Sequence, residues 1–457
     1  MKTYNDPRRT FLKTVLLATG ALIASPLGMA RAQSLSDKKV IVIGAGVSGL
    51  AAAQSLSKQG ANVTVTEAKP HIGGRLHTDY SMAVPFEYGA GWIHGPSDNN
   101  PVKRLADAVG AKTVVTDNEN LSVFNQQGDE LSDAQLEQID GNWADLLEQI
   151  DEQVTDEDRR DLRQAISDLK PDILNDPGVM WALSAYTEFS KGGAIEKLSA
   201  LYYDADKAFS GDDVVVTTGY DKILGPLSKN LDIRLSIKTT NINYDGEGVI
   251  IDTDQGPLKA DYVICSVPLG VLKSNTIKFN PALLENVQEN INTIGFGSVT
   301  KIAFKFQNAF WDTGTQYFGI MTKPKGRWNY WLNYRTFSDE NVILGLSMGD
   351  YALTADAMND KDMEQDALAV LRNVWGDDVG TPLQTLTTHW STDPFAFGAY
   401  AYATPNSQPS QFDDLAEPIA EKLVLCGEHT TFDYAGTVHG AYISGLRAAE
   451  AVINMAT

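Results

Sequence analysis

A glycine-rich turn near the start of the chain joins an apolar run to an amphipathic segment. The run at residues 40–43 is followed by GAGVSG, from Gly44 to Gly49. This order predicts a strand, a tight turn and the start of a helix, where backbone N–H groups and the helix dipole can hold a pyrophosphate. We therefore expect a dinucleotide-binding site with Gly44, Gly46, Ser48 and Gly49 among its contacts.

A second strand and an acidic residue complete this predicted unit. Residues 62–67 (NVTVTE) have the pattern of a strand, and Glu67 follows Gly44 by 23 residues. At about this spacing an acidic side chain meets a ribose hydroxyl in a βαβ nucleotide-binding unit. The glycine pattern alone is weak, but together with its strand, helix and terminal acid it is a strong signal.

The chain closes on a second glycine-rich turn. Residues 427–449 read GEHTTFDYAGTVHGAYISGLRAA, and this turn lies at the start of a predicted C-terminal helix. A helix N-terminus stabilises negative charge, so the position suits a redox ring that gains charge on reduction. The two ends of the sequence thus predict one cofactor that is held from both sides.

The order of the remaining segments predicts an α/β protein. Polar helices are expected over residues 132–170, beginning with a capping-box spacing at Ser132, and strands with a hairpin alternate between residues 213 and 306. We expect an FAD-binding, Rossmann-like domain assembled from separated segments, and an α+β substrate domain with a mixed sheet and a helical insert. The predicted segments are 38–95, 211–290 and 390–457 for the first domain, and 96–210 and 291–389 for the second.

The first 32 residues have the pattern of a targeting segment. Residues 6–13 read DPRRTFLK, an apolar stretch follows, and Ala30 and Ala32 offer a small-residue cleavage site. The alternative, a membrane anchor, needs roughly 18 apolar residues, and this stretch is shorter. We expect a twin-arginine export signal, the twin-arginine (Tat) translocase as a partner during export, a periplasmic or secreted protein, and no stable membrane span after processing.

The composition is strongly acidic. The formal net charge is −22 and would become −26 without residues 1–32, because these contain five basic residues and one acidic residue. Such a surface repels nucleic acid and attracts cations, although solubility is the commoner reason for acidity.

Cys265 and Cys426 each end an apolar run and are expected to be buried, and their pairing stays open. Without a CxxC pair or a histidine cluster, no metal site is predicted.

With these motifs the chain resembles the flavin-containing amine oxidase family, and within it the polyamine oxidase and lysine-demethylase branch. The resemblance runs from about residue 38 to 453. It is carried by GAGVSG, Glu67, GGRLHT (73–78), EYGAGWIHG (87–95), GYD (219–221), ADYVICSVPLGVLK (260–273), TKIAFKF (300–306), WSTDPFAFGAYAY (390–402) and GEHT with GTVHGAYISG. It implies an FAD-dependent oxidase that converts a small cationic amine, most simply a polyamine, to an imine and aldehyde while dioxygen becomes hydrogen peroxide.

The resemblance also implies cofactor contacts. Arg75 is expected to face the pyrophosphate, Glu428 to bind the phosphate or ribityl portion, and Thr239 to offer a backbone contact near the adenine. The N–H of Val438 is expected to point toward the pyrimidine edge of the flavin. Further expected contacts are Gly74, Gly91, Trp92, Trp390, Gly427 and Thr437. Covalent family members have a cysteine where this chain has Ala399, so the FAD is expected to be noncovalent.

Lys301 is the residue that the resemblance implies for catalysis. The family's lysine at this place holds a water beside flavin N5, whereas a lone strand lysine is more often a solvated edge residue. Tyr400 is expected to form a wall of the substrate passage. Monoamine oxidases have a second tyrosine where this chain has Thr437, and this replacement opens the aromatic cage around the substrate passage. Trp390 is expected against the flavin, with a plain core tryptophan as the alternative.

Two residues are candidates for binding the substrate. His94 is expected near the substrate nitrogen, unless it is a satisfied core histidine. Glu188 could hold a distal ammonium or be an ordinary carboxylate on a helix surface. An oxidase of a monoamine, an L-amino acid or an alkaloid amine stays open. An amino-acid substrate needs an arginine to clamp its carboxylate, and Arg234 and Arg335 keep this alternative open. A flavin-binding protein without turnover is the remaining alternative.

Overall fold

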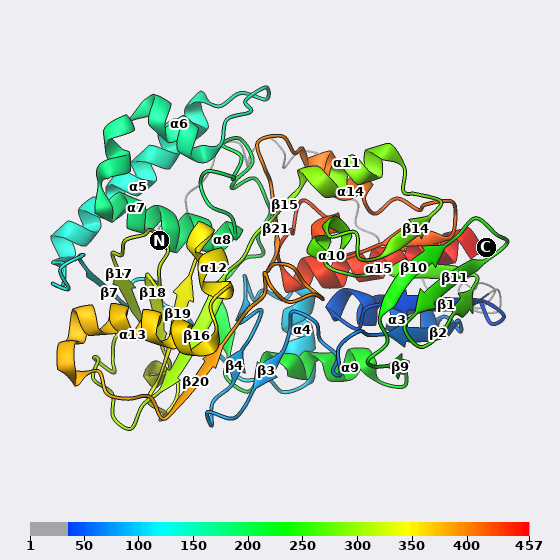
Figure 1. The fold of residues 1–457 in the computed structure, drawn as a ribbon, viewed down its shortest axis with the longest axis horizontal. Coiled ribbons are helices and arrows are strands. Elements are labelled where there is room, and N and C mark those ends of the chain that lie inside the picture. The colour runs from blue at the N-terminus through cyan, green and yellow to red at the C-terminus, as the bar shows by residue number, and fades with distance from the viewer. Residues whose placement is uncertain (1–34, 457) are drawn as a thin grey trace.

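The computed structural model describes residues 35–456, which form two lobes lying side by side (Figure 1). One lobe is built on a parallel sheet with helices α3 and α15, and the other on a six-stranded sheet with helices α5, α6, α7 and α13. The predicted export signal lies outside the described residues. Within residues 35–456, no helix combines the length and the apolar character that crossing a bilayer requires.

The parallel sheet collects strands from three separated stretches of the chain. Its order is β22-β13-β1-β2-β9, and every neighbouring pair is parallel. The central strand is an apolar run buried on both faces, as a parallel sheet covered by helices requires. The predicted α/β fold with a Rossmann-like unit is confirmed. The strands are β1 (Lys39–Ile43), β2 (Asn62–Thr66), β9 (Asp232–Arg234), β13 (Tyr262–Cys265) and β22 (Leu423–Leu425).

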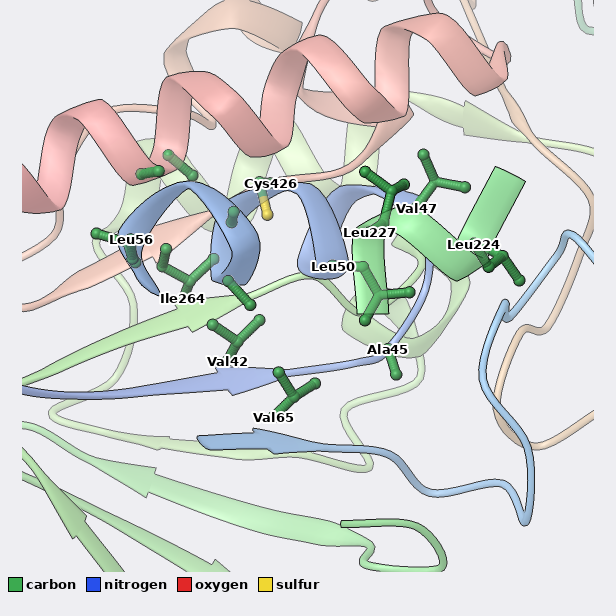
Figure 2. Packing of buried hydrophobic residues seen from close by; sticks show 14 of the residues in the cluster. Val42, Ala45, Val47, Leu50, Leu56, Val65, Leu224, Leu227, Ile264 and Cys426 are labelled. Carbon is green, nitrogen blue, oxygen red and sulfur yellow. The ribbon is translucent and has the colours of Figure 1, made fainter. Parts of the chain in front are cut away.

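Helix α3 (Val47–Lys58) lies between the sheet and the C-terminal helix α15 (Val438–Ala456), as Figure 2 shows. Leu50 and Leu56 are fully buried in this layer with Val42 of β1. Small residues let the two helices approach closely, since a Cβ added to Gly445 would lie 2.1 Å from the carbonyl oxygen of Ser48. The start of α3 is thereby fixed against α15.

Gly49 cannot carry a side chain without moving the nucleotide turn. A Cβ added there would lie 2.0 Å from the carbonyl oxygen of Gly44. We expect Gly49→Ala to destabilise the protein by about 1–3 kcal/mol and to weaken cofactor retention, measured by urea unfolding and flavin absorbance. Gly225→Ala, at a helical glycine with open space around it, is the control and should stabilise by about 0.5–1 kcal/mol. Equal unfolding midpoints for the two variants would contradict the close approach.

The six-stranded sheet forms the floor of the second lobe. Its order is β20-β16-β19-β18-β17-β7, antiparallel except for the parallel pair of β17 and β7. The predicted mixed sheet is therefore confirmed. The strands are β7 (Leu121–Phe124), β16 (Thr300–Lys305), β17 (Tyr317–Ile320), β18 (Tyr330–Asn333), β19 (Val342–Ser347) and β20 (Gln384–Thr387).

A helical insert covers one end of this sheet (Figure 1). Its first helix begins at the predicted capping box, in which Ser132 and Gln135 bond reciprocally. A π-helical turn, Leu183–Glu188, leads into the short helix that faces the first lobe. The helices of this lobe are α5 (Asp133–Gln153), α6 (Leu162–Leu169), α7 (Pro177–Ala182), α8 (Phe189–Lys191), α12 (Gly349–Asp356) and α13 (Asp360–Trp375).

Smaller sheets and short helices complete the fold. The predicted hairpin across residues 245–248 is confirmed as the antiparallel pair β10 (Thr239–Asn243) and β11 (Val249–Thr253). The strands β5 (Trp92–Ile93), β8 (Val214–Val216) and β6 (Thr113–Val115) form a three-stranded sheet. The remaining elements are β3 (Thr78–Asp79), β4 (Phe86–Glu87), α4 (Pro101–Ala108), α9 (Leu224–Ser228), β12 (Leu258–Ala260), α10 (Leu269–Lys273), β14 (Lys278–Asn280), α11 (Glu285–Thr293), β15 (Gly295–Phe296), β21 (Ala401–Tyr402) and α14 (Pro409–Asp414).

Both cysteines are buried as expected, and they are free. Cys265 and Cys426 belong to different core clusters of the parallel sheet, although the N–H of Cys426 donates to the carbonyl of Cys265 at 3.0 Å. Burial raises the pKa of each thiol to about 12. Their place in the fold is that of small core residues rather than reactive thiols.

Candidate active site

The glycine turn after β1 has the form of an anion cradle. Gly44 has a φ of 101°, which favours glycine, and a Cβ there would lie 2.5 Å from the hydroxyl of Ser266. Gly46 is the N-cap of α3 and offers no side-chain acceptor to the first-turn N–H groups. These amides are therefore available to a pyrophosphate. The hydroxyl of Ser48, by contrast, contacts the hydroxyl of Ser444 at 3.0 Å, so only its backbone can serve the predicted contact.

Glu67 stands at the end of β2, where the βαβ pattern predicts it. Its carboxylate accepts hydrogen bonds from the N–H groups of Ala45 and Lys69, both at 2.8 Å. One of its oxygens thus holds the glycine turn in place. The adenine-side segment lies alongside, because the N–H of Ile237 donates to the carbonyl of Glu67 at 2.8 Å and Thr239 begins β10 two residues later.

Arg75 and Glu428 form an ion pair across the length of the sequence. The Arg75 guanidinium donates to Glu428 Oε1 and to the carbonyl of Ala399, each at 2.7 Å. Glu428 Oε2 accepts from the N–H of Gly436 at 2.8 Å. Burial favours the neutral carboxyl, but Arg75 and the hydrogen bonds outweigh it and lower the pKa of Glu428. Arg75 was expected to face the pyrophosphate; in the structure the partner of its Nη1 group is this carboxylate.

The closing helix α15 begins at Val438, as the sequence predicts. Thr437 caps it, since its Oγ1 accepts from the N–H of Gly440 at 2.9 Å and donates to the carbonyl of Tyr434 at 2.8 Å. This is the usual role of a threonine before a helix. Because the capping bond uses the hydroxyl, Thr437 has a structural role in addition to its predicted effect on the substrate passage.

Lys301 lies on β16 with only 5% of its surface exposed. Its Nζ donates to the carbonyl of Glu87 at 3.0 Å and to that of Gly89 at 2.5 Å. The same nitrogen is 5.6 Å from the centre of the Trp92 ring and 3.5 Å from where a Cβ on Gly91 would stand. The structure therefore brings Lys301, Gly91 and Trp92 together, and Lys301 is not a solvated edge lysine.

A small cavity of about 40 Å³ adjoins Lys301. Glu87, Gly91, Trp92 and Tyr334 are among its lining residues, and its volume admits about one water molecule. Burial lowers the pKa of Lys301 and raises that of Glu87. Glu87 belongs to the EYGAGWIHG motif, but the sequence alone indicated no role for it. The signal that could have pointed to Glu87 was a single acidic residue before a glycine-rich, largely apolar stretch.

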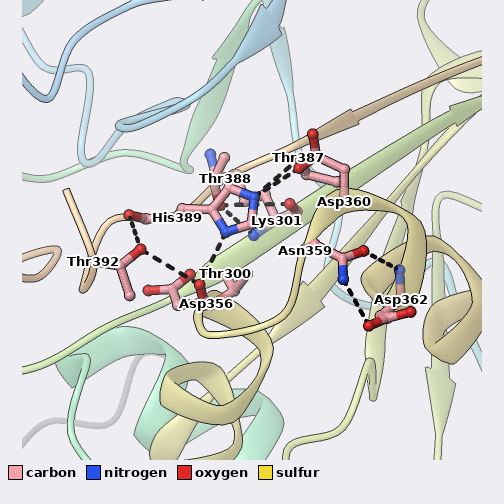
Figure 3. Close-up of polar contacts among 10 residues, drawn as sticks. All are labelled: Thr300, Lys301, Asp356, Asn359, Asp360, Asp362, Thr387, Thr388, His389 and Thr392. Carbon is pink, nitrogen blue, oxygen red and sulfur yellow. Dashed lines mark hydrogen bonds and ion pairs between the residues drawn. The ribbon is translucent and has the colours of Figure 1, made fainter.

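A polar network behind Lys301 fixes its strand to neighbouring segments (Figure 3). The Thr388 hydroxyl accepts from the N–H of Lys301 at 2.8 Å. The buried Asp356 carboxylate accepts from the hydroxyls of Ser298 and Thr300 and from the N–H of Ser391, each at 2.7 Å. Asp356 thus joins β16 to the segment that carries Trp390. Sequence reasoning missed it because the partners lie far apart in the chain.

Removing the Asp356 carboxylate should strongly destabilise the contact between β16 and the segment that carries Trp390. Asp356→Ala removes the acceptor of the buried Ser298 hydroxyl and of the half-buried Ser391 N–H. The Thr300 hydroxyl keeps the carbonyl of Ala352 as an acceptor. Since each unsatisfied buried group costs about 1–3 kcal/mol, we expect a loss of about 2–4 kcal/mol in unfolding free energy, measured by urea denaturation. Asp362→Ala, which touches only the N-cap Asn359 of α13, is the control and should cost about 1 kcal/mol. Similar losses of unfolding free energy in both variants would contradict the role of Asp356 in joining these segments.

Trp390 directly precedes Ser391 of this network. Its Nε1 donates to the carbonyl of Tyr88 at 2.8 Å, and Lys69 Nζ is 5.1 Å from the ring centre. Trp390 and Gly74, both predicted cofactor contacts, line an open groove of about 320 Å³. Trp390 is buried and borders this groove, so its contact with the flavin stays a prediction.

Tyr400 and His94, both candidates for the substrate passage, have different surroundings. The Tyr400 hydroxyl donates to the carbonyl of Phe189 at 2.5 Å, and its ring fills the space beside Gly192 and Gly436. His94 is exposed, so it is not a core histidine, and its Nδ1 is 2.6 Å from Asp213 Oδ2. Asp213 was missed by sequence reasoning because it stands 119 residues from its partner.

Both alternatives for Glu188 are wrong. Its side chain is fully buried, not on a helix surface, and it forms an ion pair with Lys325 of this chain. Glu188 Oε1 also accepts from the N–H of Ile195 at 2.9 Å. The ammonium that Glu188 binds is therefore already supplied by the protein, and the pair anchors the π-helical turn to the sheet lobe.

The two arginines considered as carboxylate clamps lie elsewhere. Arg234 pairs with Asp232 on the edge strand β9 of the parallel sheet. Arg335 donates to the carbonyl of Asp339, and neither arginine lines the cavity beside Lys301. The described residues therefore give no support to a carboxylate-binding arginine at this site.

Comparisons with known proteins agree with this geometry. The model of the family described as flavin containing amine oxidoreductase matches residues 47–453. Polyamine oxidase 2 of Arabidopsis thaliana is 32% identical over 431 residues, which cover 90% of this chain and 87% of that protein. Lysine-specific histone demethylase 2 of Homo sapiens is 29% identical over 462 residues, or 96% of this chain and 56% of that protein. A solved double mutant of a putrescine oxidase, from a redesign of cofactor binding, has a TM-score of 0.74 at 19% identity, covering 91% of this chain and 99% of that one.

Proposed function

The chain belongs to the family of flavin-containing amine oxidoreductases and is an FAD-dependent amine oxidase, and we propose that its substrates are polyamines. The net reaction is R–CH₂–NH–R′ + O₂ + H₂O → R–CHO + H₂N–R′ + H₂O₂. Bound FAD would supply the acceptor for the two electrons and the hydrogen that leave the carbon next to nitrogen. Dioxygen as the final acceptor is part of the proposal.

The observation that carries the choice of substrate is the exposed pair of His94 and Asp213. Asp213 directly precedes β8, whose Val215 lines the cavity beside Lys301. His94 is two residues from Trp92, which lines the same cavity. We propose that this carboxylate and this imidazole bind a second, distal ammonium of a polyamine. The net charge of −22 adds a long-range attraction for such cations.

Each candidate residue has its own role in the proposed reaction. His94 can accept a hydrogen bond or a proton from the substrate ammonium, because Asp213 holds its Nδ1 and leaves Nε2 free to face a ligand. Lys301 can orient a water with its third bonding position, since its other two are taken by carbonyl groups. Tyr400 and Trp92 supply aromatic walls that exclude bulk water from the reacting carbon.

A panel of amines tests the proposal. We expect hydrogen peroxide from spermine, spermidine or putrescine with purified, yellow protein, and much slower release from benzylamine and from L-amino acids. Asp213→Asn should raise KM for the polyamine about fivefold to a hundredfold, as loss of a charged partner implies, while kcat changes little. Asp212→Asn, an exposed neighbouring carboxylate, is the matched control. Good turnover of another amine class without any polyamine oxidation would overturn the assignment.

Anaerobic bleaching separates an oxidase from a flavin-binding protein without turnover. Substrate added without oxygen should remove the yellow absorbance if the protein transfers electrons from the amine. A binding protein would keep its colour. The same sample tests the mode of attachment: with Ala399 in place of a cysteine, acid precipitation should leave the flavin in the supernatant.

Export by the twin-arginine route is a further part of the proposal. It is supported by the arginine pair at 8 and 9, the short apolar stretch and the small residues at 30 and 32. This route carries folded proteins, which suits a chain whose cofactor must be bound before transport. Replacing both arginines by lysine should leave yellow protein in the cytoplasm of the host, measured by cell fractionation. Unchanged export of that variant would refute the route.

A further inference from the structure

Glu87 is a buried acid at the active site that the reaction above does not use. Only 6% of its surface is exposed. Its carboxylate accepts a hydrogen bond from the Thr78 hydroxyl at 2.6 Å and one from the N–H of Tyr220 at 2.8 Å. Its own carbonyl accepts from Lys301 Nζ at 3.0 Å, and its side chain lines the cavity that adjoins this lysine.

The two carbonyl groups that bind Lys301 do not decide the charge of its amine. An ammonium has three N–H donors and a neutral amine has two. The carbonyls of Glu87 and Gly89 satisfy two donors in either form. The third position is therefore either an N–H or a lone pair, and it lies toward Gly91 and the cavity. Another group must fix which of the two is present.

The cavity offers a route between the two side chains. Its volume of about 40 Å³ holds about one water, which needs two or more polar partners. The side chains of Glu87 and Lys301 are both within reach of the same small space, since a Cβ on Gly91 would stand 3.5 Å from Lys301 Nζ and 3.9 Å from Glu87 Cγ. A water in this space would therefore lie near both side chains.

The other titratable groups around Glu87 do not compete for its proton. Tyr334 lines the same cavity and Tyr220 lies under the carboxylate, and burial raises the pKa of both phenols well above the physiological range. Asp221 and Tyr80 bond to each other at 2.6 Å, one layer farther out. Lys305 on the same strand pairs with Glu340 instead.

We propose that Glu87 is the proton acceptor of Lys301 across this water-sized cavity. An ammonium proton of Lys301 passes to the bridging water while the water gives a proton to the Glu87 carboxylate, so that an amine and a carboxylic acid replace an ammonium and a carboxylate. No net charge is created, which suits a site closed to solvent. The reverse step returns the proton when the oxidation of the substrate demands it. Glu87 acts through Lys301 and does not touch the reacting atoms.

Burial acts on the two groups in the direction that this exchange needs. It lowers the pKa of Lys301 and raises the pKa of Glu87, which brings the two proton affinities closer together. A proton can then move between them at small cost. A surface pair such as Lys305 and Glu340, each partly exposed, lacks this effect and provides a natural comparison.

Infrared titration tests the proposal without reference to any substrate. As the pH is lowered from about 9 to about 5, a buried carboxylic-acid band should appear in the wild type and be missing in Glu87→Gln. The glutamine keeps the acceptor for the Tyr220 N–H, so the fold should persist, checked by circular dichroism and flavin content. In Lys301→Met the band should appear at higher pH, because the cation that favours ionised Glu87 is gone. A band that is unaffected by Glu87→Gln, or that does not move in Lys301→Met, overturns the proposal. If Glu87→Gln does not fold, the shift of the band in Lys301→Met tests the proposal instead.

The pH dependence of anaerobic bleaching at saturating amine gives the functional readout. Glu87 favours the ammonium form of Lys301, so Glu87→Gln should move the limb that reports Lys301 deprotonation to lower pH by about 1 unit or more. Glu340→Gln, the same change beside Lys305, should leave the profile unchanged. This part rests on the proposed function: if no amine bleaches the protein, that function fails while the infrared result still stands. Identical profiles for Glu87→Gln and wild type would refute the role of Glu87.

Discussion

Replacement of Lys301 by methionine should slow turnover about a hundredfold to ten-thousandfold, the usual contribution of a positioned acid–base group, while the protein stays yellow and folded. Methionine fills a similar volume but cannot donate to the carbonyls of Glu87 and Gly89. The amine that orients the water is lost, whereas the nucleotide turn near Gly46 is untouched. Steady-state peroxide release and single-turnover bleaching measure the effect separately for the two half-reactions.

Lys305→Met is the matched control for Lys301→Met. Lys305 lies on the same strand four residues later and is partly exposed, with Glu340 as its partner. Its replacement removes a positive charge from the same lobe but not from the site. We expect turnover within about twofold of wild type, since such partly exposed pairs contribute little. Equal losses in both variants would mean that Lys301 acts only through charge or stability.

Replacement of Arg75 by methionine should destabilise the protein by about 3–5 kcal/mol, the cost of leaving one partner of a buried ion pair alone. Glu428 would then keep a buried negative charge with only backbone N–H groups and no cation to balance it. The pair also ties the segment after β2 to the segment before α15, so the cofactor should dissociate readily. Thermal unfolding and flavin retention on gel filtration measure both effects.

The pH dependence of stability provides the control for this pair. The folded pKa of Glu428 lies below its ordinary value of 4.5, so its contribution is fully present above that value and is lost as the pH falls through the folded pKa. The stability difference between wild type and Glu428→Gln should therefore be largest near neutral pH and shrink in acid. Lys103→Met, which breaks an exposed i,i+4 pair with Asp107, should show no such dependence. A difference that grows in acid would contradict the assignment.

The sequence by itself determined the local units of the fold. Alternation and glycine chemistry predicted β1 with its turn, the capping box at Ser132, the hairpin of β10 and β11, and the start of α15 at Val438. These features depend on hydrophobic periodicity and on backbone geometry, which neighbouring residues set. Lys301 was identified through the family resemblance, which the sequence carries in a contiguous motif.

The tertiary structure alone decided which polar side chains meet. Arg75 and Glu428 stand 353 residues apart, and Glu188 finds Lys325 across 137 residues. Glu87 reaches the cavity of Lys301 only because the segment of residues 87–89 meets β16, where Lys301 binds its carbonyl groups. A pattern of residues records which face of an element is buried, but the partner of a buried charge depends on strand order and on how the lobes pack. That is why the sequence led to two wrong alternatives for Glu188 and gave no role to Glu87.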